Sequence, residues 1–181
     1  CYRMIADYLH RNYVENYAVF GHSMGSWIAY ELVEKLKKDP TVDAPERLFL
    51  SANTIPQTEV DRKTEQYTDD EFWNWIYELG GMEKELYEIA EFKDYILPII
   101  RNDYRILENY AGEKVPVRDL AADIYMMGGR QDHISQEEFM KWSQFTSQKF
   151  EFEWFDGNHF YFRKEPNRVV DYFCQKMQTE S

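Results

Sequence analysis

The amino-acid sequence predicts an α/β protein in which helices cover both faces of a parallel sheet. Short apolar segments of strand length recur along the chain, and amphipathic helical patterns separate them. Strands joined through helices in this way are typical of parallel sheets, because each crossover returns the chain to the same end of the sheet. We expect a single domain over residues 1–181, a length sufficient for one large core.

The first half of the chain alternates between helix and strand. Residues 2–14 place apolar side chains on one helical face, and residues 17–20 form a short buried strand. A second helix is expected over 24–38 and ends before Pro40, because proline cannot continue a helix. Residues 46–52 are apolar on both faces, as a central parallel strand should be.

The C-terminal part repeats this alternation. Residues 122–129 and 149–157 predict two further strands, and the helix expected between them spans 135–147. That helix begins with a serine followed three residues later by a glutamate, which is a capping box. A last helix over 167–177 closes the chain.

Residues 55–115 interrupt the pattern between the second and third strands. They show no strand pattern, and helices are expected at 69–81, 82–92 and 94–112. Connections between neighbouring elements usually have only ~2–6 residues, so a segment of this length is not a simple connector. We expect a helical insertion that lies over one end of the sheet.

Composition and charge exclude several functional classes. The formal net charge is −12 and the pI is about 4.8, so the chain repels phosphate backbones and we expect no nucleic-acid partner. Its two cysteines, Cys1 and Cys174, stand in no metal-ligand spacing, and we expect neither a metal nor a cofactor. No apolar run approaches the ~18 residues of a membrane span, which favours a cytoplasmic protein without a membrane partner.

The segment 21–25, Gly-His-Ser-Met-Gly, places Ser23 between two glycines, after a predicted strand and before a predicted helix. This is the setting in which a nucleophilic serine stands at a sharp turn. We expect a strained backbone at Ser23, and we expect both glycines to prevent collisions with strand and helix. The backbone N–H of Met24 then lies at a helix N-terminus, where it is able to stabilise an oxyanion. The alternative is a serine that merely fits a tight turn.

A nucleophilic serine requires a base, and the chain has four histidines. His159 is the expected base, because it follows the fourth strand and comes last in chain order. His133 precedes that strand and adjoins Asp132, and we expect a neighbouring pair to orient the imidazole poorly. The other two are His10, on the first helix, and His22, within the turn itself.

Asp132 is the expected acid, because it lies in the loop that ends the third strand. Asp156 is a rival, although its place three residues before His159 favours a role in the turn. Asp123 lies within a strand and is expected to face a helix or an edge. In the mechanism that follows, His159, held by Asp132, takes the proton from Ser23 as the serine attacks an acyl carbonyl.

Five motifs follow one another along the chain: "FGHSMGSWIAYEL" at the serine, "ERLFLSANTIP", "ILPIIRNDYRILENY", "GGRQD" and "DGNHFYF". Trp142 stands between the last two. In these motifs and in this tryptophan the sequence resembles the type II thioesterases that accompany nonribosomal peptide and polyketide synthases. The resemblance covers essentially all 181 residues.

The resemblance implies an α/β-hydrolase fold with Ser23, Asp132 and His159 as the catalytic triad. It also implies that the helical insertion 55–115 is a lid over an acyl pocket. Enzymes of this family hydrolyse stalled or wrongly primed acyl groups from the phosphopantetheine arm of acyl or peptidyl carrier proteins. The expected substrate is therefore a carrier-bound acyl thioester, and the expected partner is the carrier protein.

The chain departs from the family pattern at its front, where the family has further strands and the loop that supplies a second oxyanion donor. We expect that these N-terminal strands are missing here, and that residues 1–181 alone fold poorly and are nearly inactive. Two other functions fit the same residues. One is a general esterase or lipase of this fold, and the other is a non-catalytic binding protein. Nothing in the sequence calls for more than a monomer.

Overall fold

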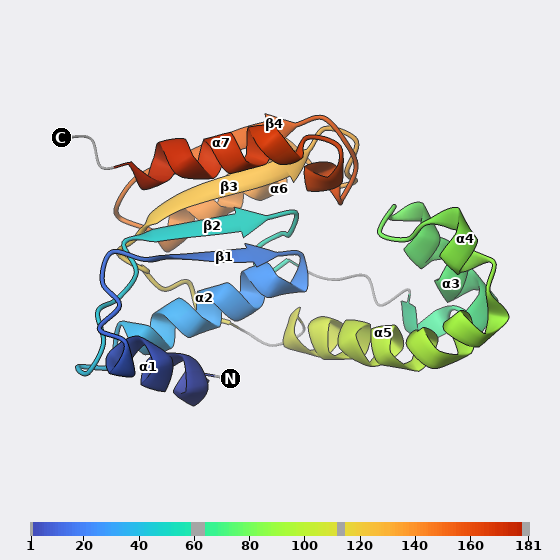
Figure 1. Cartoon of the computed structure of the whole chain (residues 1–181), viewed down its shortest axis with the longest axis horizontal. Coiled ribbons are helices and arrows are strands. Elements are labelled where there is room, and N and C mark those ends of the chain that lie inside the picture. Colours follow the sequence, from blue (N-terminus) through green and yellow to red (C-terminus); the bar gives the residue numbers. More distant parts are fainter. Residues whose placement is uncertain (1, 59–63, 112–114, 179–181) are drawn as a thin grey trace.

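The computed structural model describes residues 2–58, 64–111 and 115–178, and its centre is a four-stranded sheet (Figure 1). Every neighbouring pair of strands is parallel, so the predicted parallel sheet is confirmed. Because all strands run the same way, their carboxyl ends meet at one edge. The strands, in their order across the sheet, are β1 (Ala18–His22), β2 (Arg47–Ser51), β3 (Asp123–Gly129) and β4 (Phe150–Phe155).

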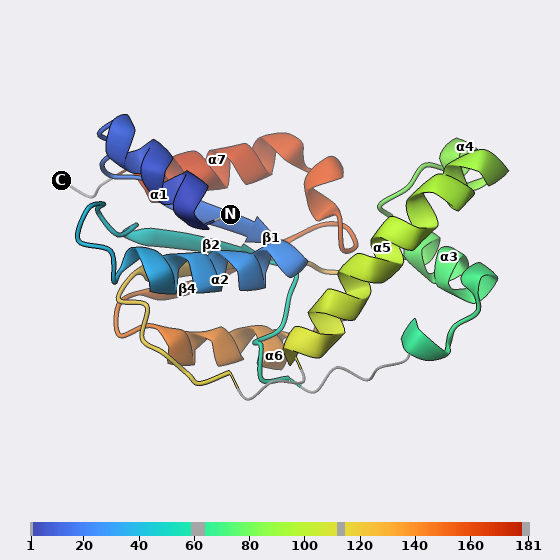
Figure 2. The same cartoon turned by 90° about the horizontal axis from the view of Figure 1, so that it is seen from below.

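Helices lie on both faces of the sheet. Helix α7 covers one face, whereas α2 and α6 cover the other (Figure 2). A short 3-10 helix over Lys141–Phe145 extends α6, where the sequence predicts one continuous helix over 135–147. The bounds are α1 (Tyr2–Arg11), α2 (Met24–Leu36), α6 (Gln136–Met140) and α7 (Pro166–Met177).

The alternation of side chains along β2 divides the core into two layers. Leu48 and Leu50 are fully buried against α2 and α6, in a cluster that also holds Trp142. Phe49 points to the opposite face and packs against Tyr172 of α7. Both faces of this strand are therefore buried, as its apolar sequence predicts.

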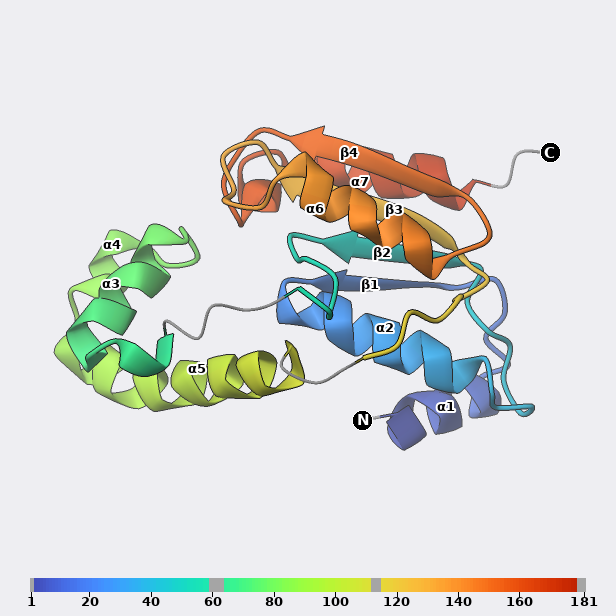
Figure 3. The same cartoon turned by 180° about the vertical axis from the view of Figure 1, so that it is seen from behind.

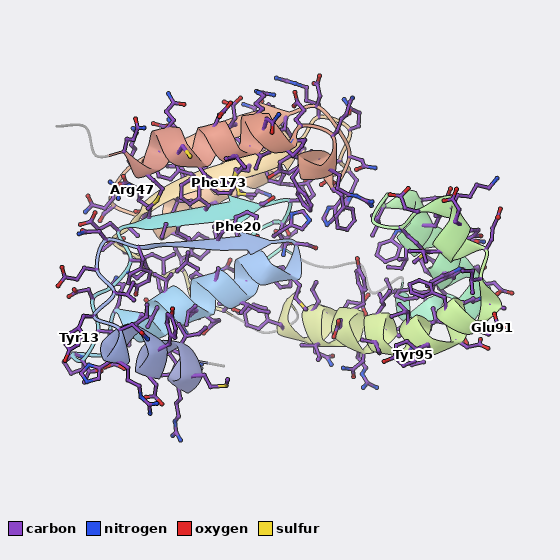
Figure 4. All side chains as sticks on the ribbon, viewed as in Figure 1. Tyr13, Phe20, Arg47, Glu91, Tyr95 and Phe173 are labelled. Carbon is purple, nitrogen blue, oxygen red and sulfur yellow. The ribbon has the colours of Figure 1, made fainter. Side chains whose placement is uncertain are left out.

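Strand β1 forms one edge of the sheet. Its Phe20 is half exposed and contacts Phe173 of α7 edge to face, with ring centroids 5.3 Å apart (Figure 4). Helix α1 lies beside this edge and packs against α2 through Leu9 and Leu36. In the part of the chain that the structure describes, no helix is both long and apolar enough to cross a membrane.

The insertion forms a separate group of helices beyond the carboxyl ends of the strands (Figures 1 and 3). It has its own apolar cluster around Phe72, Trp73, Ile76 and Leu97. Residues 59–63 and 112–114, near the two ends of the insertion, lie outside the described residues. Its elements are a short 3-10 helix (Thr64–Gln66), α3 (Asp69–Glu78), α4 (Lys84–Tyr87) and α5 (Ala90–Ala111).

The helix predicted over 82–92 is wrong in extent, because α4 spans only four residues. The Tyr87 carbonyl accepts the indole N–H of Trp73 at 3.1 Å, whereas a continuous helix would use that carbonyl within its own backbone. The two rings also stack, with centroids 6.1 Å apart. This packing against α3 lies where the helical pattern is interrupted, between Tyr87 and Ala90, a position that periodicity alone does not mark.

The loop between α3 and α4 contacts the loop after β4. Gly80 has a φ of 82°, and a Cβ at this position would lie 2.0 Å from the Asn158 side chain. Glu83, just before α4, forms an ion pair with Arg163. The far end of α5 meets α2, where the Tyr110 hydroxyl donates to Glu31 at 2.8 Å. The insertion is thus anchored on both sides of the strand ends.

Candidate active site

Ser23 stands at the turn between β1 and α2 in a strained conformation, with φ 53° and ψ −126°. Such backbone angles in a residue other than glycine cost about 1–3 kcal/mol and persist only where the surroundings hold them. Here the Ser23 N–H donates to the Ser51 carbonyl at 2.8 Å, and the Asn53 amide donates to the Ser23 carbonyl at 2.8 Å. The turn is therefore fixed by the end of the neighbouring strand β2.

The two glycines beside Ser23 differ in their surroundings. A Cβ at Gly21 would lie 2.2 Å from the Gly25 carbonyl oxygen, so no side chain fits there. A Cβ at Gly25 would have nothing within 4 Å apart from its neighbours and its own helix. The expectation that both glycines avoid collisions is wrong for Gly25, because its Cβ would point to open space.

Substitutions at these two glycines should have opposite effects on stability. Gly21→Ala forces a methyl group against backbone atoms and should lower the free energy of unfolding by about 1–3 kcal/mol. Gly25→Ala lies in α2 and should raise it by up to about 1 kcal/mol, because alanine favours the helix. Urea unfolding of both variants measures the difference. Equal losses would contradict this account of the turn.

The hydroxyl of Ser23 faces a cavity at the start of α2. Met24 is the first residue of this helix, and the first N–H groups of a helix lack partners within it. The cavity has a volume of about 340 Å³ and is lined by both Ser23 and His159. An acyl group bound there would meet the serine oxygen beside a helix N-terminus, where partial positive charge favours an oxyanion.

Asp132 and His159 are hydrogen bonded at the carboxyl ends of β3 and β4, with Asp132 Oδ2 2.9 Å from His159 Nδ1. Both side chains are buried, at 1% and 7% exposure. Burial alone would raise the pKa of Asp132. The hydrogen bonds from His133 and His159 outweigh it and hold that pKa well below its ordinary range. Asp132 is therefore an anion that orients the imidazole of His159.

Ser23 and His159 line the same cavity, although no hydrogen bond joins their side chains within the described residues. Such bonds are often long before a substrate is bound. Met24 follows Ser23 directly. The four residues singled out in the sequence thus meet at one end of the sheet, and their catalytic roles stay predictions.

Backbone contacts join the acid loop to the base loop. The Gln131 N–H donates to the Gly157 carbonyl at 2.9 Å, and the Gly157 N–H donates to the Gln131 side chain at 2.7 Å. The Arg130 N–H also donates to the Phe155 carbonyl at 2.9 Å. Because β3 and β4 are adjacent and in register, these contacts hold the carboxylate and the imidazole at a fixed separation.

His133 also contacts the acid, although the sequence favours His159 as its partner. Its Nδ1 lies 2.8 Å from Asp132 Oδ1, and its backbone N–H donates to the same oxygen at 2.7 Å. The tight turn lets the ring fold back onto its neighbour's carboxylate. The hydrogen bond to Asp132 raises the pKa of His133 above its ordinary value. Asp132 therefore holds two imidazoles.

The rival acids lie away from the imidazole. Asp156 is about half exposed and faces Arg130 at 3.5 Å. Asp123 opens β3 at the amino end of the sheet, where it accepts the Lys149 N–H at 3.2 Å. His10 is exposed on α1 and contacts the Thr41 carbonyl.

A hydrogen-bonded network below the site was not foreseen from the sequence. His22 Nδ1 lies 2.9 Å from the Ser51 hydroxyl, which in turn lies 2.7 Å from the Tyr161 hydroxyl. The His22 ring packs beside His159, with centroids 4.9 Å apart. Burial and the nearby His159 lower the pKa of His22 to about 4, so this ring is neutral near pH 7. The only sequence signal was the position of His22 next to Ser23.

Several aromatic side chains of the insertion line the cavity, among them Tyr67, Trp75 and Tyr104. An apolar second cavity of about 310 Å³ lies within the insertion and shares Leu79 and Tyr104 with the first. Phe160, the residue after His159, also lines the second cavity. The two cavities are therefore adjacent, and Leu79 and Tyr104 form the wall between them.

The described residues contain no group of three or more His, Cys, Asp or Glu side chains that could hold a metal ion. Cys174 is exposed on α7, and Cys1 lies outside the described residues.

Comparison of the sequence with known protein families agrees with this arrangement of residues. A family model described as a thioesterase domain matches residues 3–177. The chain belongs to the thioesterase domain family. The chain is 32% identical over 154 residues to the phenyloxazoline synthase MbtB of Mycobacterium tuberculosis. This match covers 84% of the chain and 10% of that protein.

Several solved structures have folds similar to that of this thioesterase domain. One is RedJ, a thioesterase from the prodiginine pathway of Streptomyces coelicolor, with 28% identity and a TM-score of 0.79 over 95% of this chain and 65% of that one. Another is BorB, a type II thioesterase from the borrelidin cluster, with 26% identity and a TM-score of 0.76 over 98% and 73%. The resemblance to type II thioesterases and the α/β-hydrolase fold are confirmed.

This thioesterase domain is shorter than the proteins that it resembles. It spans 10% of the first curated relative and 65% of another. What those complete proteins act on is therefore carried to this chain only as a proposal.

Proposed function

We propose that this chain is a serine thioesterase that removes acyl groups from the phosphopantetheine arm of acyl or peptidyl carrier proteins. One observation carries the proposal: in a chain of the thioesterase family, Ser23 shares a cavity with a buried His159 that Asp132 holds by a hydrogen bond. A bound carboxylate fixes the imidazole so that its other nitrogen accepts a proton.

In the proposed mechanism, His159 takes the proton of Ser23 as the serine oxygen attacks the thioester carbonyl. The Met24 N–H stabilises the resulting oxyanion, and the carbon–sulfur bond then breaks to release the carrier thiol, which takes its proton from His159. Water next attacks the acyl-serine with His159 again as base, and the free acid leaves. No metal or cofactor enters these steps, because the substrate brings its own phosphopantetheine.

The surroundings of Ser23 support an acyl substrate. Trp27, Tyr104 and Leu107 give the cavity apolar walls, and the insertion lies over the strand ends like a lid. A lid that covers the site excludes water from all but the productive step. The second cavity beyond Leu79 and Tyr104 would take the distal part of a longer acyl chain.

The test uses a carrier protein whose phosphopantetheine bears an acetyl or hexanoyl group. Release of the acyl group is followed by intact mass, with the Ser23→Ala variant as the blank. We expect release by the unaltered chain and none by the variant, and such release would contradict the sequence-based expectation that residues 1–181 alone are nearly inactive. Cleavage of a simple oxygen ester without release from the carrier would favour a general esterase. Failure of a serine-directed phosphonate to label Ser23 would favour a non-catalytic binding protein.

Filling the second cavity should shorten the acyl chains that the enzyme accepts. Ile96→Trp enlarges a residue on its wall, so long chains lose apolar contacts and their kcat/KM should fall about three- to fourfold for each excluded methylene. Acetyl release should not change. The matched control is Tyr95→Trp, since Tyr95 is a neighbour on α5 that is 73% exposed (Figure 4). A uniform loss for all chain lengths would contradict the assignment of this cavity.

A further inference from the structure

The carboxylate of Asp132 binds two histidines, one through each oxygen. Oδ2 lies 2.9 Å from Nδ1 of His159, and Oδ1 lies 2.8 Å from Nδ1 of His133. The two rings are nearly parallel, at 24°, with centroids 6.3 Å apart. A mechanism that uses only Ser23, Asp132 and His159 leaves the second imidazole without a role.

The two imidazoles differ in their access to water. The side chain of His133 is 69% exposed, whereas that of His159 is only 7% exposed. A proton from solution therefore reaches His133 at low cost, because its charged form stays hydrated while it contacts the carboxylate. Both residues line the cavity that holds Ser23.

The charges around His133 favour its protonated form. Its hydrogen bond to Asp132 raises the pKa of His133, burial acts against this, and the negative charges of Asp132 and Glu138 add to the increase. The other titratable groups that line the shared cavity are Tyr67, Tyr104, Glu108 and His159, and the ring of His22 packs against His159 with centroids 4.9 Å apart. Of these, His159 is the one whose charge state the proposed reaction uses.

We propose that His133 is a positioning residue that holds Asp132 for His159 and takes up the first proton on acidification, so that the fall of the reaction rate at acid pH depends on His133. This inference rests on the proposed role of His159. The physical reason is repulsion between like charges. Once His133 is a cation, a second proton on His159 would place two positive charges on one carboxylate, about 6 Å apart.

The sign of the effect follows from this repulsion. The proposed reaction needs His159 as a neutral base, and a positive charge on His133 opposes a second positive charge on the same carboxylate. Removal of His133 should therefore move the fall of the rate to higher pH. For a partly exposed pair at this separation we expect a change of about half to one pH unit.

The test is the His133→Asn variant of the full chain, which keeps a side-chain N–H donor and cannot titrate. The second-order rate of Ser23 labelling by a fluorophosphonate is measured from pH 4.5 to 9 and compared with the unaltered chain. We expect the acidic midpoint to rise by about half to one unit, while the rate above pH 8 stays within about threefold. His10→Asn, at an exposed histidine on α1, is the matched control and should leave the profile unchanged.

His133→Ala adds a second readout, because it removes both the donor and the titrating group. It should shift the midpoint in the same direction and also lower the rate above pH 8, about tenfold, since Asp132 loses a partner. Thermal melting at each pH checks that the variants are folded.

Superimposable profiles for His133→Asn and the unaltered chain would overturn the inference, and so would a lack of labelling of Ser23 in the unaltered chain. If Ser23 is labelled but no acyl group is released from a carrier protein, the thioesterase proposal fails. The labelling profiles still decide the role of His133 in that case.

Discussion

Replacing Ser23 by alanine should lower acyl release from a carrier protein by about 10⁴- to 10⁶-fold, because the variant cannot form the acyl-enzyme. The fold should be unaffected, since the Ser23 backbone makes the contacts that fix the turn. Stopped-flow release of a chromogenic acyl thioester measures the fall, and circular dichroism checks the fold.

Ser26→Ala is the matched control for this variant. Ser26 is a buried serine in the first turn of α2, and its hydroxyl oxygen lies within hydrogen-bond distance of the carbonyls of Gly21 and Ser51, at 2.9 and 3.0 Å. Its removal should lower stability by about 1 kcal/mol and leave most of the activity. A Ser23→Ala variant that keeps more than about a hundredth of the rate would contradict covalent catalysis by this serine.

The sequence predicts the fold well because its signals are local and agree with each other. The strand at 46–52 is apolar at every central position, and the structure buries it on both faces. Chain order and strand ends bring Ser23, Asp132 and His159 to one edge, because parallel strands end together. Ser23 and His159 therefore line one cavity, and Asp132 is hydrogen bonded to His159 beside it.

Other features depend on contacts between distant segments, and no local pattern marks them. The helix predicted over 82–92 is interrupted after Tyr87, where the Tyr87 carbonyl accepts the indole N–H of Trp73. His133 reaches Asp132 because the turn bends its ring back onto the carboxylate, a contact that the order of these two residues in the sequence does not indicate. Gly25 has open space beside it, which only the path of the turn determines.

Asp132→Asn should lower kcat/KM about 10⁴-fold while the binding of substrate changes little, because the defect lies in the base rather than in the cavity. An asparagine presents an N–H where the carboxylate accepts the His159 Nδ1–H. The imidazole then adopts the other tautomer, and the nitrogen that should accept the serine proton carries a hydrogen instead. Asp156→Asn, at a half-exposed carboxylate on the neighbouring loop, is the control and should retain nearly full activity.

The same substitution should change stability in a way that depends on pH. The pKa of Asp132 is held below its ordinary value, so its ionised form stabilises the fold above the unfolded pKa of about 4, and this contribution is lost as the pH falls toward the folded pKa. Asp132→Asn should therefore be less stable than the unaltered chain at pH 7, and the difference should shrink below pH 4. Urea unfolding at pH 7 and pH 3 measures both values. A difference that grows on acidification would mean that Asp132 is not an ion in the folded state, and His159 would then have no carboxylate to hold it.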